Sequence, residues 1–224
     1  MPIAIDGSGT ITGITSGGLP DNIITNAELA DDAVAIADLA ATGTPSATTF
    51  LRGDNSWAAA GGGKILQVLQ STLTDVSTTS TKETWLDIAG TDQAGSGSIF
   101  CVKITPTAAT SKILFSTSLH YSTTSNNTVA IGLYRDSTLI LQGDASTSKM
   151  RATSMMYESD DINMQLKHLQ YLDSPSSTSE LTYKQMHYTY NTDTFYINRS
   201  DRDYAGIHYD HRCASTLTVM EVGA

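Results

Sequence analysis

Residues 112–121 read KILFSTSLHY, and this stretch decides the fold class of the chain. Successive side chains of a β-strand point to opposite faces of the sheet. One face here carries Ile113, Phe115, Thr117, Leu119 and Tyr121, while the other carries Leu114, Ser116, Ser118 and His120. This period of two predicts a half-buried strand.

Further runs of the same kind follow along the chain from Lys64. Apolar residues alternate at 129–133 and at 195–197, and a last run at 217–222 has less distinct faces. Clusters of polar turn residues at 123–127, 142–144 and 173–177 separate the runs. Many strands joined by Ser-, Thr- and Gly-containing turns are typical of a sandwich. The sequence therefore predicts an all-β, jelly-roll-like β-sandwich head over residues 64–224.

The first 63 residues differ in composition from the rest. They contain only two aromatic residues, Phe50 and Trp57, and they end in the Gly triplet 61–63. Such a triplet is a flexible junction. We therefore expect a short N-terminal arm over residues 1–63, with Gly53-Asp54-Asn55 forming a simple turn before Trp57.

A helix is predicted inside this arm. Thr25 and Glu28 have the spacing of a capping box, and an apolar stripe of helical period follows at Leu29, Ala33, Ile36, Ala37 and Ala40. An isolated helix of about four turns is marginal in water. The stripe is therefore covered either by a partner or by the rest of its own domain.

The formal net charge of −10 and the pI near 4.7 argue against two classes of binding partner. Neutralising phosphates requires a basic surface, so a nucleic-acid partner is not expected, and an anionic membrane surface is not expected for the same reason. No run of about 18 apolar residues is present, which argues against membrane insertion. No secretory signal is visible, and Cys101 and Cys213 are expected to be reduced, unpaired thiols.

The sequence contains no strong metal-binding or catalytic motif. His208, Asp210 and His211 do not have the spacing of a zinc site, and no Gly-x-Ser-x-Gly elbow follows a strand. The acidic residues Asp160, Asp161, Asp201 and Asp203 are expected to be exposed in turns. We therefore predict a binding protein that is not an enzyme, with no catalytic residue, no metal and no cofactor.

The stretch 198–212 is the candidate recognition site. Arginine and tyrosine are enriched at binding hot spots, and polar groups beside aromatic rings suit sugar recognition. The predicted recognition residues are Arg199, Arg202, Tyr204, His208, Tyr209 and Arg212. The alternative interpretation is a solvated loop between two strands.

Several segments resemble tail-fibre and related virion proteins of tailed bacteriophages. Residues 42–57 (TGTPSATTFLRGDNSW) resemble a recurring element of those proteins, and residues 24–33 (ITNAELADDA) resemble their shaft repeats. In the predicted head, the similar segments are ITP at 104–106, SKIL at 111–114, YLDSP at 171–175, FYINRS at 195–200 and STLTVME at 215–221.

The resemblance implies a homotrimer, an N-terminal segment that attaches to the phage particle, and assembly in the host cytoplasm. We accordingly expect a structural virion protein, a short trimeric tail fibre. It would bind other tail or baseplate proteins through residues 1–63 and a host-surface glycan or protein through its head. The predicted helical stripe would then be the trimer contact. A connector or decoration protein without a receptor role is the alternative, and a glycan depolymerase is a third.

Overall fold

The computed structural model describes Ala35 and residues 40–59, 64–124, 126–190, 194–206, 208 and 210–223. The chain divides into two compact units, Met1–Gly62 and Gly63–Ala224, and each is described by itself. The described residues are all-β and contain no helix, so they include no helix long enough to cross a membrane. Four residues of the predicted helical stripe, Leu29, Ala33, Ile36 and Ala37, lie outside the described residues, and Ala40 is exposed in irregular chain.

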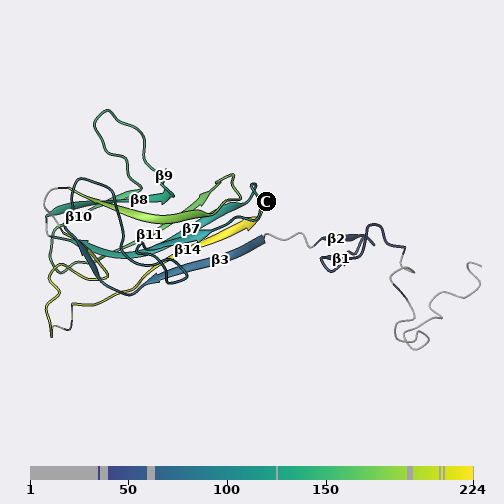
Figure 1. The fold of residues 1–224 in the computed structure, drawn as a ribbon, viewed down its shortest axis with the longest axis horizontal. Helices are drawn as coiled ribbons and strands as arrows, with labels where there is room; N and C mark the ends of the chain where they lie inside the picture. The colour runs from purple at the N-terminus through teal and green to yellow at the C-terminus, as the bar shows by residue number, and fades with distance from the viewer. Residues whose placement is uncertain are drawn as a thin grey trace, which may run out of the picture. The chain divides into compact units, whose positions relative to one another are not determined.

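The second unit, which we call the head, is built from two six-stranded antiparallel sheets (Figure 1). Sheet I contains β3 (Lys64–Leu73), β4 (Ser77–Thr79), β7 (Lys112–Thr123), β11 (Gln165–Asp173), β13 (Phe195–Ile197) and β14 (Ser215–Gly223). Its strand order is β3–β14–β7–β13–β4, and β11 pairs with β7 on the edge opposite β14.

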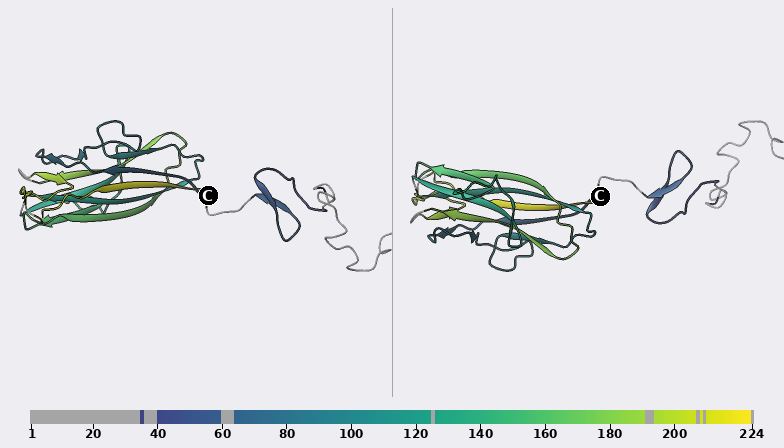
Figure 2. Two further views of the ribbon diagram at one scale, coloured as in Figure 1. Left: turned by 90° about the horizontal axis from the view of Figure 1, so that it is seen from below. Right: turned by 90° about the horizontal axis from the view of Figure 1, so that it is seen from above.

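Sheet II contains β5 (Leu86–Asp87), β6 (Cys101–Ile104), β8 (Asn127–Arg135), β9 (Thr138–Leu141), β10 (Ser154–Glu158) and β12 (Leu181–Thr189). Its order is β10–β8–β12–β5, with β6 paired to β12 and β9 paired to β8. The two sheets form two layers in a sandwich-like arrangement (Figure 2). The predicted all-β, sandwich-like class is confirmed.

The core lies between the two sheets and is filled by alternating residues. Of the two predicted faces of β7, the one that runs from Ile113 to Tyr121 is buried. Facing side chains from sheet II include Ile131, Leu133 and Tyr183, all fully buried. This burial of the period-two face is the dominant favourable contribution to folding of the head.

One end of the interior holds polar side chains that have partners. Asp173, on sheet I, accepts hydrogen bonds from Arg135 Nη1 at 2.6 Å and Tyr183 Oη at 2.7 Å, both on sheet II. The three side chains therefore join the two sheets, and we call them the paired end.

Glu221 lies near the paired end, because both Glu221 and Asp173 are in register with Ile113. Its Oε1 accepts from the backbone N–H and the hydroxyl of Thr107, each at 2.7 Å, and its Oε2 accepts from Gln67 Nε2 at 2.6 Å. Burial raises the pKa of this carboxyl, but the hydrogen bonds outweigh burial and bring the pKa to about 2. Glu221 is therefore a buried carboxylate at neutral pH.

The opposite end of the interior holds Tyr121, Glu158 and His187, which we call the unpaired end. Within the described part of the chain, Tyr121 Oη, Glu158 Oε2 and both ring nitrogens of His187 have no hydrogen-bond partner. The His187 ring stacks on Phe195 with centroids 4.0 Å apart and planes 9° apart. Burial lowers the pKa of His187 to about 4, so the ring is neutral at pH 7.

Within the first unit, residues 40–59 contain a small hairpin of β1 (Thr49–Leu51) and β2 (Trp57–Ala59). The Asn55 N–H donates to the Arg52 carbonyl at 2.9 Å, which closes the expected turn at Gly53-Asp54-Asn55. Gly43 has φ of +91°, and a Cβ there would lie 2.7 Å from the Trp57 carbonyl oxygen. Only glycine therefore fits where the chain passes Trp57.

Candidate recognition site

The loop that contains the predicted recognition residues connects β13 to β14 and is fixed at its base by Asn198. This buried residue has φ of +60°, and its side-chain amide donates to the carbonyls of Leu73 at 2.8 Å and Asp75 at 3.0 Å. Its Oδ1 accepts from Ser215 Oγ at 2.7 Å, and its carbonyl accepts from the Cys213 N–H at 3.1 Å. Both ends of the loop are thereby held together.

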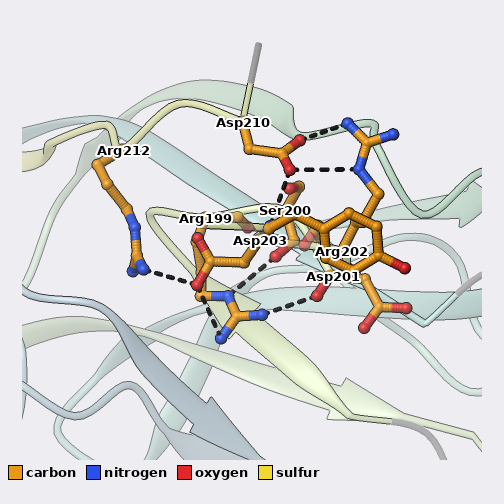
Figure 3. A network of polar contacts seen from close by, with 9 residues as sticks. Arg199, Ser200, Asp201, Arg202, Asp203, Asp210 and Arg212 are labelled. Atoms are coloured by element: carbon orange, nitrogen blue, oxygen red, sulfur yellow. Dashed lines mark hydrogen bonds and ion pairs between the residues drawn. The ribbon is translucent and has the colours of Figure 1, made fainter. Parts of the chain in front are cut away.

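Two carboxylates organise the interior of this loop (Figure 3). Asp210 receives two hydrogen bonds from Arg202, at 2.5 Å and 3.2 Å, in the bidentate geometry that makes arginine–carboxylate pairs strong. Asp203 lies 2.6 Å from Arg212 and 3.3 Å from Arg199. The hydrogen bonds from Arg202 hold the pKa of Asp210 below its usual value, so this pair stays charged at neutral pH.

The guanidinium of Arg199 makes further contacts within the loop. It donates to the carbonyl oxygens of Ser200 at 2.9 Å and Asp201 at 2.7 Å, and it lies 4.7 Å from the centre of the Tyr196 ring. Arg202 similarly lies 5.5 Å from the centre of the Tyr204 ring. Through these contacts, the two largely buried arginines restrain the loop.

The six predicted recognition residues thus fall into three groups. Arg199 and Arg202 point into the loop, and Arg212 is half exposed and paired with Asp203. Tyr204 and His208 are exposed, whereas Tyr209 lies outside the described residues. The loop therefore offers solvent a tyrosine ring and a partly engaged arginine, held on a rigid base.

Residues considered for other chemistry are also placed by the structure. No group of three metal-ligating side chains occurs among the described residues, which include His208, Asp210 and His211. Asp203 forms ion pairs with Arg199 and Arg212. Asp160 accepts a hydrogen bond from the Ile162 N–H at 3.0 Å. Cys101 is buried and Cys213 half-buried, and both are free thiols.

A second site was missed by sequence reasoning and lies on the outer face of sheet II. A cavity of about 440 Å³ is lined by Tyr188, Tyr190, Thr128, Ala130, Lys149 and Met150. Thr128, Ala130 and Met150 also line a neighbouring cavity of about 370 Å³. The alternation Tyr188-Thr189-Tyr190 indicates only that two tyrosines share one face of a strand. The small residues Thr128 and Ala130 that form the rest of the site belong to another strand and lie 58 or more positions earlier in the sequence.

No protein-family model and no curated protein matches this chain.

Proposed function

We propose that this chain is a structural protein of a tailed-phage virion, a short fibre whose three copies attach the particle to the host surface. Residues 1–63 would bind other tail or baseplate proteins, and the head would be a jelly roll that binds a surface glycan or protein. The strand orders β3–β14–β7–β11 and β6–β12–β8–β10 support the jelly-roll assignment, because that fold stacks two four-stranded sheets.

The observation that carries this proposal is a row of apolar side chains across the outer face of sheet I. Val68 lies in register with Met220, Met220 with Leu114, and Leu114 with Leu172. Val68 and Leu172 are about half exposed. A continuous apolar row that crosses four strands favours a surface that is covered by another protein.

On one side of the apolar row this face lacks full charges, and on the other side it carries Lys112, in register with Val222. The next two rows contain neither acid nor Lys or Arg; they are formed by Gln70, Thr218, Ser116 and Gln170, and by Thr72, Thr216, Ser118 and His168. Depletion of charged residues is typical of interface centres. Because the chain is acidic overall, a neutral face is where copies approach one another with least repulsion.

Three associated heads would repeat one weak binding site three times. Linked sites raise apparent affinity by about two to four orders of magnitude without any new contact. This multiplication suits attachment to a repetitive cell surface, where a single site is weak.

Association through this face is tested by Val68→Asp on the full chain. We expect the mass of the wild-type assembly to be three times 23.9 kDa, and we expect the variant to be a monomer because a carboxylate would be buried in the interface. Val76→Asp is the matched control, since Val76 is also exposed but lies between β3 and β4, outside the row. Native mass spectrometry at micromolar concentration gives the readout. A monomeric wild type, or trimers in both variants, would contradict the proposal.

The attachment role is tested separately with labelled full-length protein. We expect wild-type protein to be retained on intact bacteria, and to compete with the virion that carries it for adsorption. Retention on purified tail particles alone would favour the connector role instead.

A further inference from the structure

The two cavities on the outer face of sheet II form one trough, because they share Thr128, Ala130 and Met150. Their volumes, about 440 and 370 Å³, are in the range of small-ligand sites. The register explains why a hollow lies here. On the central strand β8, the outward positions are the small residues Thr128 and Ala130, which form the floor.

Large side chains on both neighbouring strands form the walls. Met155 of β10, which lines the smaller cavity, is in register with Ala130 on one side. Tyr188 of β12 is in register with Ala130 on the other, and Tyr190 follows two residues later on the same face. Since adjacent strands are about 4.8 Å apart, the walls stand about 10 Å apart. This width admits a single ring beside the aromatic faces of Tyr188 and Tyr190.

Tyr188 is part of a packed aromatic group. The Trp85 ring lies 5.8 Å from both the Tyr134 and the Tyr188 rings. Beneath it, Gly132 has no room for a side chain, since a Cβ would lie 2.7 Å from the Tyr134 ring and 3.0 Å from the Trp85 ring. Tyr188 is therefore held in place before any ligand arrives.

Positive charge lies at the rim of the trough. The connection between β9 and β10, which rises away from the strands in Figure 1, contributes Lys149 and Arg151 to the lining. Neither has an ion-pair partner among the described residues, and Arg151 Nε donates to the Gly143 carbonyl at 2.6 Å. Asp144 is the single acid in the lining. Two cations on an acidic protein favour an anionic ligand.

Other hollows and clusters of the head lack this combination. A cavity of about 530 Å³ near β6 is lined by Lys103 and Lys184, but these lysines are paired with Asp92 at 3.0 Å and Asp87 at 2.6 Å. In the loop between β13 and β14, the guanidinium groups of Arg199 and Arg202 are engaged with the loop itself.

We propose that the trough binds a carboxylated sugar ring of a surface polysaccharide. The ring's C–H face stacks on Tyr188 and Tyr190, and its carboxylate pairs with Lys149. This inference rests on the proposed attachment function and names the site and the ligand class for it. It moves the recognition centre from the loop at 198–212 to the outer face of sheet II.

The experiment applies labelled full-length protein to an array of bacterial saccharides that includes neutral and uronic-acid-containing members. We expect wild-type protein to bind the carboxylated members. Thr128→Trp fills the floor and should abolish binding, and Tyr190→Ala should weaken it at least tenfold. Lys149→Gln should remove the preference for carboxylated over neutral members.

Tyr204→Ala is the rival variant, because Tyr204 and Tyr190 are 60% and 59% exposed and the substitution removes the same ring from the 198–212 loop. Loss of binding in Tyr204→Ala with retention in Thr128→Trp overturns the trough assignment. Wild-type protein that adsorbs to bacteria but binds no saccharide overturns this inference and leaves the attachment function intact. Wild-type protein that does not adsorb to bacteria overturns the attachment function itself. The native mass of every variant confirms that it assembles like the wild type.

Discussion

Buried polar groups are hydrogen-bonded at one end of the sandwich interior and lack hydrogen-bond partners at the other, among the described residues. At the paired end, Asp173 on one sheet receives hydrogen bonds from Arg135 and Tyr183 on the other. At the unpaired end, Tyr121 and His187 are as deeply buried as Tyr183, yet their polar atoms have no partner in the described part of the chain. The two tyrosines thus have the same side chain and the same burial, and they differ only in whether a partner is within reach.

This difference separates two contributions to stability. A satisfied buried polar group fixes how the sheets stack, and it is costly to break because the remaining partner stays buried. An unsatisfied buried group already carries its desolvation cost in the folded state. The paired end should therefore be sensitive to substitution, and the unpaired end should be sensitive to protonation.

The largest expected effect is at the paired end. Arg135→Met leaves the Asp173 carboxylate buried without its cation, and we expect a loss of about 4 kcal/mol in the free energy of unfolding. Urea unfolding followed by circular dichroism, at one fixed protein concentration, gives the value. The double variant Arg135→Met/Asp173→Leu should recover part of this loss and not all of it, because the buried Tyr183 hydroxyl then has no acceptor. An equal loss in the double variant would show that packing, and not the unpaired charge, is responsible.

The next effect is acid sensitivity at the unpaired end. In the unfolded chain His187 takes up a proton below its ordinary pKa of 6.5, whereas in the fold it stays neutral down to about pH 4. Stability should therefore be lost as the pH falls from 6.5 to 4, by about 3 kcal/mol. Glu221, with its folded pKa of about 2, contributes acid sensitivity only between about pH 4.5 and 2.

Urea unfolding at pH 7, 5.5 and 4 tests the assignment to His187. His187→Leu should flatten the loss between pH 6.5 and 4 while leaving the loss below pH 4.5 in place. An unchanged pH profile in this variant would mean that another group titrates in the upper range.

The smallest effect comes from the matched tyrosines. Tyr183→Phe removes a hydrogen bond to a buried carboxylate and should cost about 2 kcal/mol, whereas Tyr121→Phe removes an unsatisfied hydroxyl and should cost about 0 kcal/mol. Both substitutions keep the ring and its contacts. Urea unfolding midpoints of the two variants and the wild type measure these losses in stability. Equal losses in the two variants would contradict the proposed difference between the two ends.

Much of the sandwich could be predicted from the sequence, because a buried strand face repeats every second residue. This rule correctly grouped Ile113 and Phe115 on one face, and the structure shows that this face is the buried one. It left the faces of the last run, 217–222, indistinct, because Glu221 stands at a core position of β14. Its hydrogen-bond partners Thr107 and Gln67 lie 114 and 154 residues away. Only the folded chain brings together the donors that let a carboxylate be buried there.

The sites were harder to predict for a related reason. The composition of residues 198–212 correctly drew attention to a cluster of arginines and acids, but composition does not say that Arg202 pairs with Asp210 across the loop. The trough was even harder to predict from the sequence. Tyr188 and Tyr190 form a wall only because the register sets them beside Thr128 and Ala130 of another strand.

The pairing of Gly223 with Lys64 at the end of β14 and β3 has a practical consequence. The first and last strands of the head begin and finish side by side (Figure 1), so a short engineered bridge would close this unit into a ring. New ends could then be opened in the exposed connection between β9 and β10, since circular permutation is best tolerated at such surface positions. A permuted head of this kind would allow a reporter peptide to be placed directly at the rim of the trough.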